Sequence, residues 1–338
     1  MKNLSAFQKI IFFINNIFAV LLVLALLIPY MEPKVFPEIS VLSLAAPVLL
    51  FIHVLFIAFW ILFGFKKQFL LSAFCVLLSI TFSYFPYKFS RTVTETSNSF
   101  KVMSYNVRNF NRYLWINDKN IPHKISQFIL ENDPDILSFQ EYYSSKETEL
   151  NFPYHYLEFK GEKNKTGQAI FSKYKIINQG SLNFKKSRNN AIFIDVLKGS
   201  DTFRIYNIHL ESLGIRPDSV YLSEQNSKRL LFRLSESFVK QQAQVEQFVQ
   251  HKNQCKSDII ICGDFNNTAY SWAYDKIKGD FKDTFLEAGK GFGKTYTLKT
   301  YPLRIDFILV GEKFHIDEHE NFRVNFSDHE PILAKLSN

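Results

Sequence analysis

The first 91 residues contain three long runs of hydrophobic side chains with no charged residue among them. The runs are Ile10–Ile28, Val41–Phe65 and Phe69–Phe85. Because an α-helix rises about 1.5 Å per residue, about 20 apolar residues cross the hydrocarbon core of a bilayer. A core helix of a soluble protein keeps a polar face, which these runs almost entirely lack, and a cleaved signal peptide would explain only the first run. The pattern therefore predicts an anchor of three transmembrane helices over residues 1–89.

From Phe100 onward the pattern changes to short apolar runs rich in Ile, Val, Phe and Tyr, which predict strands. The predicted strands are Phe100–Tyr105, Ile136–Phe139, Ala169–Phe171, Ala191–Val196, Phe203–Leu210, Asp258–Cys262 and Arg304–Val310. Helical spacing occurs in Pro122–Asn132 and Leu230–Gln250. Because several neighbouring strands have no helix between them, we expect two packed sheets covered by helices, in one domain over residues 100–338. The Thr/Ser/Asn-rich stretch 90–99 is predicted to be a linker.

The charge and the cysteine content of the chain exclude few classes of function. The formal net charge is +8, from 40 basic and 32 acidic residues. The first 91 residues hold seven of the basic and two of the acidic ones, which leaves 33 basic and 30 acidic residues for the remainder. The predicted domain is therefore nearly neutral, and the basic balance of the chain is poor evidence for a nucleic-acid partner. Three cysteines do not suggest a disulfide framework.

Five short polar motifs follow predicted strands or lie near the end of the chain. They are Ser104-Tyr105-Asn106, Phe139-Gln140-Glu141, Ile208-His209-Leu210, Gly263-Asp264-Phe265-Asn266 and Ser327-Asp328-His329, with Ile305-Asp306-Phe307 before the last. Taken alone, an Asn after a strand is typical of a turn, and a strand-end Glu is typical of a solvated surface. Together, these side chains would supply one magnesium-dependent site for cutting phosphate esters.

The residue types fit that chemistry. Mg²⁺ prefers hard oxygen ligands, so Glu141 is the expected main carboxylate, and Asn106 is placed to hold a metal-bound water or a phosphate oxygen. Asp264 and Asn266 are two residues apart, so on an extended chain their side chains point to the same side. An Asp that accepts a proton from water beside an Asn that donates to phosphate suits an in-line attack.

Asp306 lies inside a predicted strand, where an unpaired buried charge would be unfavourable. It needs a partner, and His329 is the natural candidate. A carboxylate beside this imidazole would orient the ring and favour its charged form.

The order of these residues resembles the endonuclease/exonuclease/phosphatase superfamily, which includes pancreatic deoxyribonuclease, abasic-site endonucleases, inositol polyphosphate 5-phosphatases and neutral sphingomyelinases. The resemblance covers roughly Phe100 to the C-terminus, and the Gly-Asp-Phe-Asn and Ser-Asp-His motifs are its most specific parts. It implies an α/β fold, a four-layer α/β sandwich with two packed mixed sheets flanked by helices. It also implies a metal-dependent hydrolase that uses Mg²⁺ or Mn²⁺.

The resemblance assigns roles residue by residue. Glu141, Asn106 and Asp328 would hold the metal ion. Asp264 would orient or deprotonate the attacking water.

The remaining roles concern the phosphate. Asn266 would bind the scissile phosphate, and His329, paired with Asp306, would contact it and stabilise its growing charge. His209 would contact phosphate or help to protonate the leaving oxygen. Arg188 stands where many members have an Arg before a strand, although a solvated loop Arg is an equally good explanation.

We therefore expect a membrane-anchored phosphoesterase that hydrolyses phosphodiester bonds, with a nuclease among the candidates. The alternatives are a lipid- or nucleotide-directed phosphodiesterase or phosphatase, and a non-catalytic binding domain on the same fold. The complete set of polar residues weighs against the last. The expected partners are a phosphate ester (nucleic acid, nucleotide or lipid head group) and the bilayer, through residues 10–85; no protein partner is predicted. The polar segment Ser212–Lys228 has the position of a substrate-shaping insertion but names no substrate.

Charges beside the apolar runs predict the orientation in an inner or plasma membrane. Lys2 and Lys9 precede the first run, and Lys66 and Lys67 separate the second from the third. By the positive-inside rule both regions should be cytoplasmic, and three crossings then place residues 100–338 on the non-cytoplasmic side. Lys88 and Arg91 after the third run argue in the opposite direction.

Overall fold

The computed structural model describes residues 4–64, 66–82, 86–89, 98–148, 150–161, 165–214, 227–298 and 301–338. It divides into two compact units. The first comprises Met1–Pro86, Ser227–Gln242 and Asn267–Asp275, and the second comprises Tyr87–Asn226, Ala243–Asn266 and Lys276–Asn338. Most of the predicted linker, residues 90–97, lies outside the described residues.

The first unit is built on three apolar helices, α1 (Ala6–Leu27), α3 (Leu42–Leu62) and α4 (Phe69–Thr81). Two short elements, η1 (Ile28–Tyr30) and α2 (Pro37–Ser40), lie between α1 and α3. The helix α1 begins at Ser5, whose hydroxyl accepts a hydrogen bond from the Gln8 amide at 3.2 Å and so satisfies a free N–H of the first turn. The three helices meet through a small apolar core that includes Leu22, Leu49 and Cys75.

Among the described residues, two helices have the length and composition of a membrane span. These are Ala6–Tyr30, of 25 residues, and Leu42–Leu62, of 21 residues. Only 28% of each apolar window is buried within the structure, so most of their hydrophobic side chains face outward. The third predicted transmembrane helix is present as α4, but its length as a span is not shown, because the described helix has only 13 residues. At about 1.5 Å per residue it is shorter than the roughly 30 Å hydrocarbon core.

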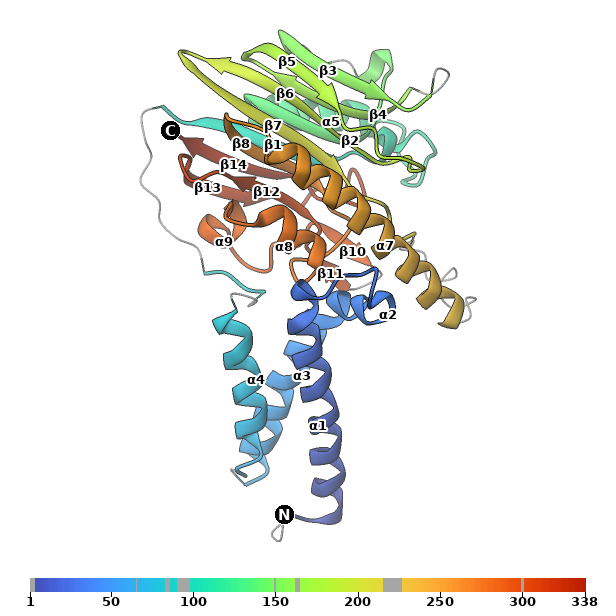
Figure 1. The fold of residues 1–338 in the computed structure, drawn as a ribbon, viewed down its shortest axis with the longest axis vertical. Helices are drawn as coiled ribbons and strands as arrows, with labels where there is room; N and C mark the ends of the chain where they lie inside the picture. Colours follow the sequence, from blue (N-terminus) through green and yellow to red (C-terminus); the bar gives the residue numbers. More distant parts are fainter. Residues whose placement is uncertain are drawn as a thin grey trace. The chain divides into compact units, whose positions relative to one another are not determined.

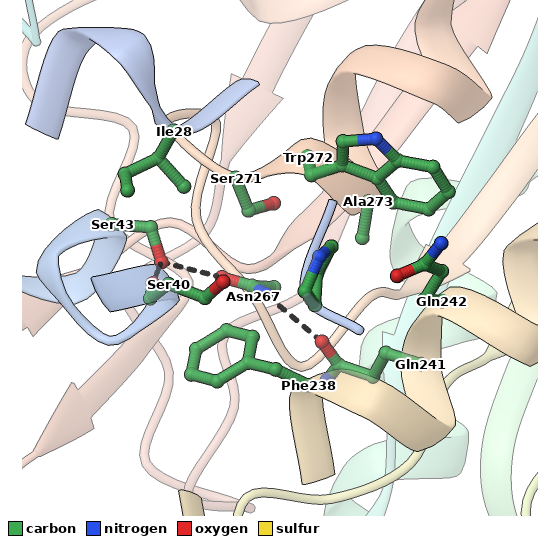
Figure 2. A pocket seen from close by; sticks show the side chains of 11 residues that line it. Ile28, Ser40, Ser43, Phe238, Gln241, Gln242, Asn267, Ser271, Trp272 and Ala273 are labelled. Carbon is green, nitrogen blue, oxygen red and sulfur yellow. Dashed lines mark hydrogen bonds between the residues drawn. The ribbon is translucent and has the colours of Figure 1, made fainter. Parts of the chain in front are cut away.

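Two segments from later in the chain complete the first unit. They are the first part of α7 (Ser227–Lys252) and the segment that leads into α8 (Trp272–Lys278). The Asn267 side chain donates to Gln241 Oε1 at 2.9 Å and accepts from Ser43 Oγ at 3.3 Å. Figure 2 shows these side chains around a small cavity lined also by Ile28, Phe238 and Ser271.

The second unit contains two mixed six-stranded sheets (Figure 1). The first has the order β13 (His315–Asn321), β14 (Ile332–Ser337), β1 (Phe100–Asn106), β2 (Ile136–Tyr143), β4 (Thr166–Ser172) and β3 (Tyr154–Phe159). The second has the order β5 (Lys175–Ser181), β6 (Asn190–Lys198), β7 (Asp201–His209), β8 (Asp258–Asp264), β12 (Asp306–Val310) and β9 (Lys282–Asp283). A separate pair is formed by β10 (Tyr296–Leu298) and β11 (Tyr301–Leu303).

The two sheets pack face to face around an apolar core. Residues of the first sheet, such as Val102 and Ile136, share this core with Ile205, Ile260 and Ile308 of the second. All five are fully buried, and fully burying one such side chain stabilises the fold by roughly 1.5–3 kcal/mol. The core therefore fixes how the strand ends of the two sheets are placed beside each other.

Helices cover the outer faces of the sandwich. The helix α5 (Ile121–Asn132) packs Ile125 and Phe128 with Met103 and Phe139 of the first sheet. On the second sheet, the Tyr206 hydroxyl lies 2.8 Å from His251 Nδ1 in α7. The short α9 (Thr284–Ala288) follows β9. The predicted sandwich of two packed mixed sheets flanked by helices is confirmed.

Candidate active site

The predicted polar motifs gather because parallel strands end at the same edge of each sheet. In the first sheet β1 and β2 are parallel, and Asn106 pairs with Gln140, directly before Glu141. In the second sheet β7 and β8 are parallel, and His209 pairs with Asp264. The antiparallel β12 begins at Asp306, which is the partner of Asp264 on the other side.

Gly263 makes the pairing of β7 with β8 possible. Its φ is +144°, and a Cβ atom at this position would lie 1.9 Å from the carbonyl oxygen of Ile208. Only a residue without a side chain allows this approach, since heavy atoms cannot come so close. The glycine of the Gly-Asp-Phe-Asn motif thus sets the register that brings Asp264 beside His209.

Asp264 is at the centre of the site and is 1% exposed. Its Oδ2 atom accepts a hydrogen bond from Asn106 Nδ2 at 3.0 Å, and it lies 3.6 Å from His209 Nε2 and 3.7 Å from His329 Nε2. Its Oδ1 atom accepts from the backbone N–H of Asn266 at 2.7 Å. Burial raises the pKa of Asp264, and the His329 imidazolium opposes that rise. A carboxylate in this environment can take up a proton near neutral pH.

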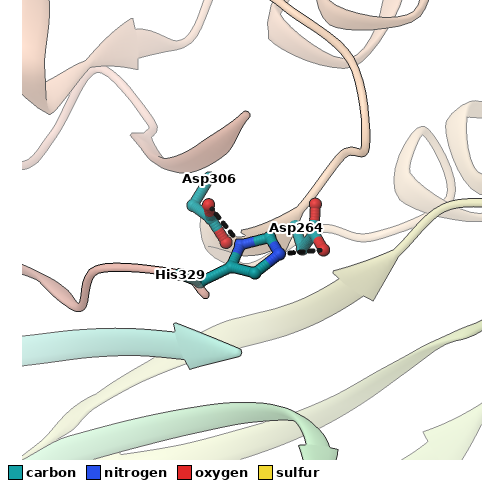
Figure 3. A group of neighbouring side chains, drawn as sticks. All are labelled: Asp264, Asp306 and His329. Atoms are coloured by element: carbon teal, nitrogen blue, oxygen red, sulfur yellow. Dashed lines mark hydrogen bonds and ion pairs between the residues drawn. The ribbon is translucent and has the colours of Figure 1, made fainter. Parts of the chain in front are cut away.

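His329 lies between two carboxylates, as Figure 3 shows. Its Nδ1 atom is 2.9 Å from Asp306 Oδ2, and its Nε2 atom faces Asp264. Burial acts to lower the pKa of His329, but the charges of Asp306 and Asp264 outweigh burial and raise this pKa to about 10. The ring is therefore an imidazolium at neutral pH, in a site where positive charge can stabilise a phosphate.

His209 differs from His329 in charge. Burial lowers the pKa of His209 to about 3, and the cations His329 and Lys160 add to this effect. The imidazole is therefore neutral, with Nε2 directed to Asp264. One histidine of the site carries charge and the other does not, which gives them different roles toward a phosphate ester.

Glu141 reaches the site through an irregularity in its strand. The register between β2 and β4 shifts between Phe139 and Tyr142, and Glu141 has a φ of +52°. A bulge of this kind redirects a side chain near a functional site. The Glu141 carboxylate accepts from Asn109 Nδ2 at 3.1 Å and from Asn106 Nδ2 at 3.4 Å.

The surroundings of Glu141 fit a divalent cation. Burial, and after it the nearby Asp328 charge, raise the pKa of Glu141, so a cation bound here would stabilise the ionised carboxylate. Among the described residues, no cationic side chain lies within 4 Å of its carboxylate. Oxygen donors on Glu141, Asn106 and Asp328 are the type that Mg²⁺ or Mn²⁺ takes. The neighbouring Asp264, Asp306 and His329 also cluster, but the imidazolium already offsets part of the negative charge there.

Two other residues predicted to bind phosphate, Asn266 and Arg188, differ in their contacts with the site. The Asn266 side chain bonds to the carbonyl of Leu210 at 3.0 Å and to Asp264 Oδ2 at 3.3 Å, so in this structure it supports Asp264. Arg188 is exposed in the loop before β6, and no ion pair within the described ranges joins it to the other site residues. Its neighbour Asn189 instead donates to Leu210, the same carbonyl that Asn266 uses.

The site includes residues that sequence patterns did not identify. Arg108 forms an ion pair with Asp328 at 3.2 Å, and the Tyr296 ring lies 4.8 Å from the His329 ring. Ser327 fixes the last motif to the first, because its hydroxyl donates to the carbonyl of Asn106 at 2.8 Å. The position of Arg108, two residues after the strand-end Asn106, was the one available signal. The predicted insertion 212–228 lies largely outside the described residues.

Comparisons with known families give two matches. The model of the Endonuclease/Exonuclease/phosphatase family matches residues 103–329, which include every site residue named above. A second model, a domain of unknown function (DUF8431), matches residues 8–84. A search of curated proteins found no match.

Solved structures show the same fold at low sequence identity. Humanized D. rerio TDP2 with 14 mutations has a TM-score of 0.55 at 15% identity, covering 72% of this chain and 100% of that one. The human Nocturnin catalytic domain with bound sulfate has a TM-score of 0.53 at 17% identity, covering 71% of this chain and 93% of that one. A Bacteroides vulgatus endonuclease/exonuclease/phosphatase has a TM-score of 0.54 at 17% identity, covering 71% of this chain and 99% of that one.

Proposed function

Because the chain belongs to the endonuclease/exonuclease/phosphatase family, whose members are phosphoesterase hydrolases, we propose that it is a membrane-anchored, Mg²⁺- or Mn²⁺-dependent phosphodiesterase. One observation carries the proposal: a buried carboxylate, Asp264, lies between a neutral His209 and a charged His329. A binding domain would not need two histidines in opposite charge states around one carboxylate. This arrangement supports proton transfer beside a phosphate.

The reaction begins with a water molecule at Asp264. The raised pKa of this carboxyl lets Asp264 take the proton as the water oxygen forms its bond to phosphorus. Hydrogen bonds from Asn106 and from the Asn266 backbone hold the carboxylate in position. Fixing the base in this way lowers the entropy lost in reaching the transition state.

Charge that develops on the phosphate oxygens is stabilised by the His329 imidazolium. Asp306 fixes the orientation of that ring through Nδ1, which leaves Nε2–H on the side of Asp264 to donate to a phosphate oxygen bound there. When bound by Glu141, Asn106 and Asp328, the metal ion supplies further positive charge to the phosphate and the leaving oxygen. As the bond from phosphorus to that oxygen breaks, the oxygen needs a proton. The neutral His209 ring can accept at Nε2 the proton held by Asp264, 3.6 Å away, and pass a proton on from Nδ1 to the leaving oxygen.

The second part of the proposal concerns the membrane. The family model over residues 8–84 covers α1, α3 and α4 together, which supports treating them as one module. Along α4, Leu70, Phe74 and Leu77 are more than half exposed, as expected for side chains facing lipid. We propose that α4 and its flanking residues complete a third crossing, so that the catalytic domain is non-cytoplasmic. C-terminal alkaline phosphatase and fluorescent-protein fusions test this: fluorescence without phosphatase activity would place the domain in the cytoplasm.

Hydrolysis of bis-p-nitrophenyl phosphate by the full-length chain in detergent tests the catalytic proposal. We expect turnover with Mg²⁺ or Mn²⁺, none in EDTA, and recovery when the metal is restored. His329→Gln should lower turnover strongly, whereas His123→Gln, at an exposed position on α5, should not. Turnover that persists in EDTA would contradict the metal-dependent reaction, and a fully active His329→Gln variant would contradict the assigned site.

A further inference from the structure

The loop that follows β1 carries an unusual concentration of exposed apolar side chains beside the site. Tyr113, Leu114 and Trp115 are 61%, 53% and 45% exposed. The rings of Tyr113 and Trp115 are in contact, with their centroids 5.0 Å apart. We call these three residues the aromatic tip. Exposed aromatic side chains grouped in this way commonly mark a binding surface.

The aromatic tip is tied to the catalytic residues by arginine. The guanidinium of Arg108 lies 4.3 Å from the centre of the Trp115 ring and also pairs with Asp328 at 3.2 Å. A single side chain therefore separates Trp115 from the motif that ends in His329. A group bound on the tip would lie next to a phosphate at the site.

A second arginine extends the same surface. The Arg112 guanidinium lies 4.2 Å from the centre of the Tyr143 ring and 5.6 Å from that of Tyr113. Among the described residues, no carboxylate lies within 4 Å of Arg112, so its charge is available to an anion. Tyr143 ends β2, two residues after Glu141. Rings and guanidinium groups thus alternate along the surface from β2 to the aromatic tip.

The backbone holds the aromatic tip in one shape. Five non-glycine residues have positive φ here: Arg108, Asn109, Phe110, Asn111 and Leu114. This conformation costs roughly 1–2 kcal/mol at a residue such as Arg108, Phe110 or Leu114, and less at asparagine. The Asn111 side chain compensates by donating to the carbonyls of Ile116 at 2.7 Å and Asp118 at 2.9 Å. Such strain is kept where a fixed geometry serves a function.

We infer that the aromatic tip is a subsite for an unpaired base of a single-stranded nucleic acid whose phosphate lies at the catalytic residues. This rests on the proposed phosphodiesterase function and specifies its substrate class. Exposed rings beside basic side chains are how proteins bind single strands, since bases stack on the rings and cations meet the phosphates. A base in a duplex is already stacked on its neighbours and cannot use this surface.

The alternative occupant, a lipid surface, fits less well. The aromatic tip is only three residues long, with Asn111 and Arg112 before it and the polar run Asn117–Asn120 after it. Pushing the tip into hydrocarbon would desolvate those groups, which is unfavourable without partners. A planar base requires only the ring faces, which are already exposed.

The test compares two probes that differ only in their bases. Full-length protein in detergent micelles and EDTA is titrated into a fluorescein-labelled oligodeoxythymidylate, or into the same backbone with abasic sugars, and anisotropy gives Kd. Trp115→Ala should weaken binding of the thymidylate by about 5- to 150-fold, the range for losing one stacked base. Binding of the abasic strand should be unchanged, and Trp115→Phe should restore most of the affinity.

Tyr154→Ala provides the matched control. Tyr154 is 38% exposed and pairs with Ser172, at the end of the first sheet opposite to Glu141. The Tyr154→Ala variant should bind both probes as the wild type does. The inference is overturned if Trp115→Ala weakens binding of both probes equally or of neither, or if the wild-type protein binds no thymidylate. It is also overturned if Trp115→Ala weakens only the binding of sphingomyelin, measured in mixed micelles. Hydrolysis of bis-p-nitrophenyl phosphate is scored separately, so failure of this subsite is distinguishable from failure of the proposed function.

Discussion

Asp306 and His329 form a buried ion pair, with 2.9 Å between Oδ2 of the carboxylate and Nδ1 of the imidazole. The two residues are 2% and 6% exposed and come from different elements, the first residue of β12 and the loop before β14. The other oxygen of the carboxylate, Oδ1, is buried without a hydrogen-bond partner within the described ranges. The carboxylate thus acts on the histidine through a single bond, which makes its contribution measurable by one substitution.

Asp306→Asn should lower kcat of phosphodiester hydrolysis by about 100-fold, because the amide holds the ring but no longer favours its charged form. KM should change much less, since Asp306 does not reach the substrate. Steady-state kinetics on bis-p-nitrophenyl phosphate measures both values. Asp201→Asn, at an exposed strand end, is the control. An unchanged kcat in Asp306→Asn would mean that the charge of His329 does not matter.

Gly263→Ala should destabilise the protein far more than Gly199→Ala. Both glycines have positive φ, +144° and +62°, so both alanines are strained by roughly 1 kcal/mol or more. Only Gly263 faces a carbonyl, at 1.9 Å from the position of a Cβ, while nothing lies within 4 Å of such an atom at Gly199. Thermal unfolding followed by circular dichroism compares the two. Equal midpoints would show that β7 and β8 can separate without loss.

Stability should fall in mild acid because of His319, a buried histidine outside the site. Burial lowers its pKa to about 4, and the Asp283 carboxylate offsets this only in part. The unfolded chain takes up a proton below pH 6.5, whereas the folded chain does so only near pH 4. The free energy of unfolding therefore decreases as the pH falls through this window, by about 1.4 kcal/mol per unit at most.

Thermal midpoints between pH 7 and 4.5 measure that effect. His319→Gln removes the titrating group, so its midpoint should depend less steeply on pH than that of the wild type. His123→Gln changes an exposed histidine and should keep the wild-type slope. Parallel curves for wild type and His319→Gln would refute the assignment.

Glu141→Gln should raise the Mg²⁺ concentration needed for half-maximal activity more than any other single change. The amide keeps one oxygen and the shape of Glu141 but loses the negative charge that attracts the cation. Activity titrations with MgCl₂ measure the shift, with Glu147→Gln, in the turn after β2, as the control. A wild-type Mg²⁺ dependence in Glu141→Gln would move the metal site elsewhere.

The sequence predicted the central strands of the fold better than the edges. Apolar runs such as Ile136–Phe139, interrupted only by Ser138, and Ile259–Cys262 became β2 and β8, which have neighbours on both sides. The strands β3, β5, β9 and β13 were missed, and each lies at the edge of a sheet. Edge strands are paired on one side and partly solvated, so their side chains lack the apolar pattern on which the prediction depends. The strand β14 was also missed, and it is not an edge strand.

The candidate site was predictable where its residues end strands. Asn106, Glu141, His209 and Asp264 stand in motifs after apolar runs, and the structure brings them together with His329, which belongs to the Ser-Asp-His motif near the end of the chain. Arg108 approaches the site from the turn after β1 and Tyr296 from the start of β10, and only the folded chain shows that they reach it. The length of the third apolar run was misleading for a related reason. Absence of charge does not reveal where a helix ends, and α4 ends at Thr81.

Replacement of Asp264 tests the account most directly. Asp264→Asn keeps the shape of the side chain, but it replaces one accepting oxygen with an NH₂ group and cannot take a proton from water, so turnover should fall by about two to four orders of magnitude. The fold should survive, because burial disfavours the charge that is removed. Asp258→Asn, at the partly exposed beginning of the same strand, should retain wild-type turnover. Hydrolysis of bis-p-nitrophenyl phosphate by the three full-length proteins gives the answer. Loss in Asp264→Asn alone is the predicted result, and equal turnover in all three would contradict the assignment of this site.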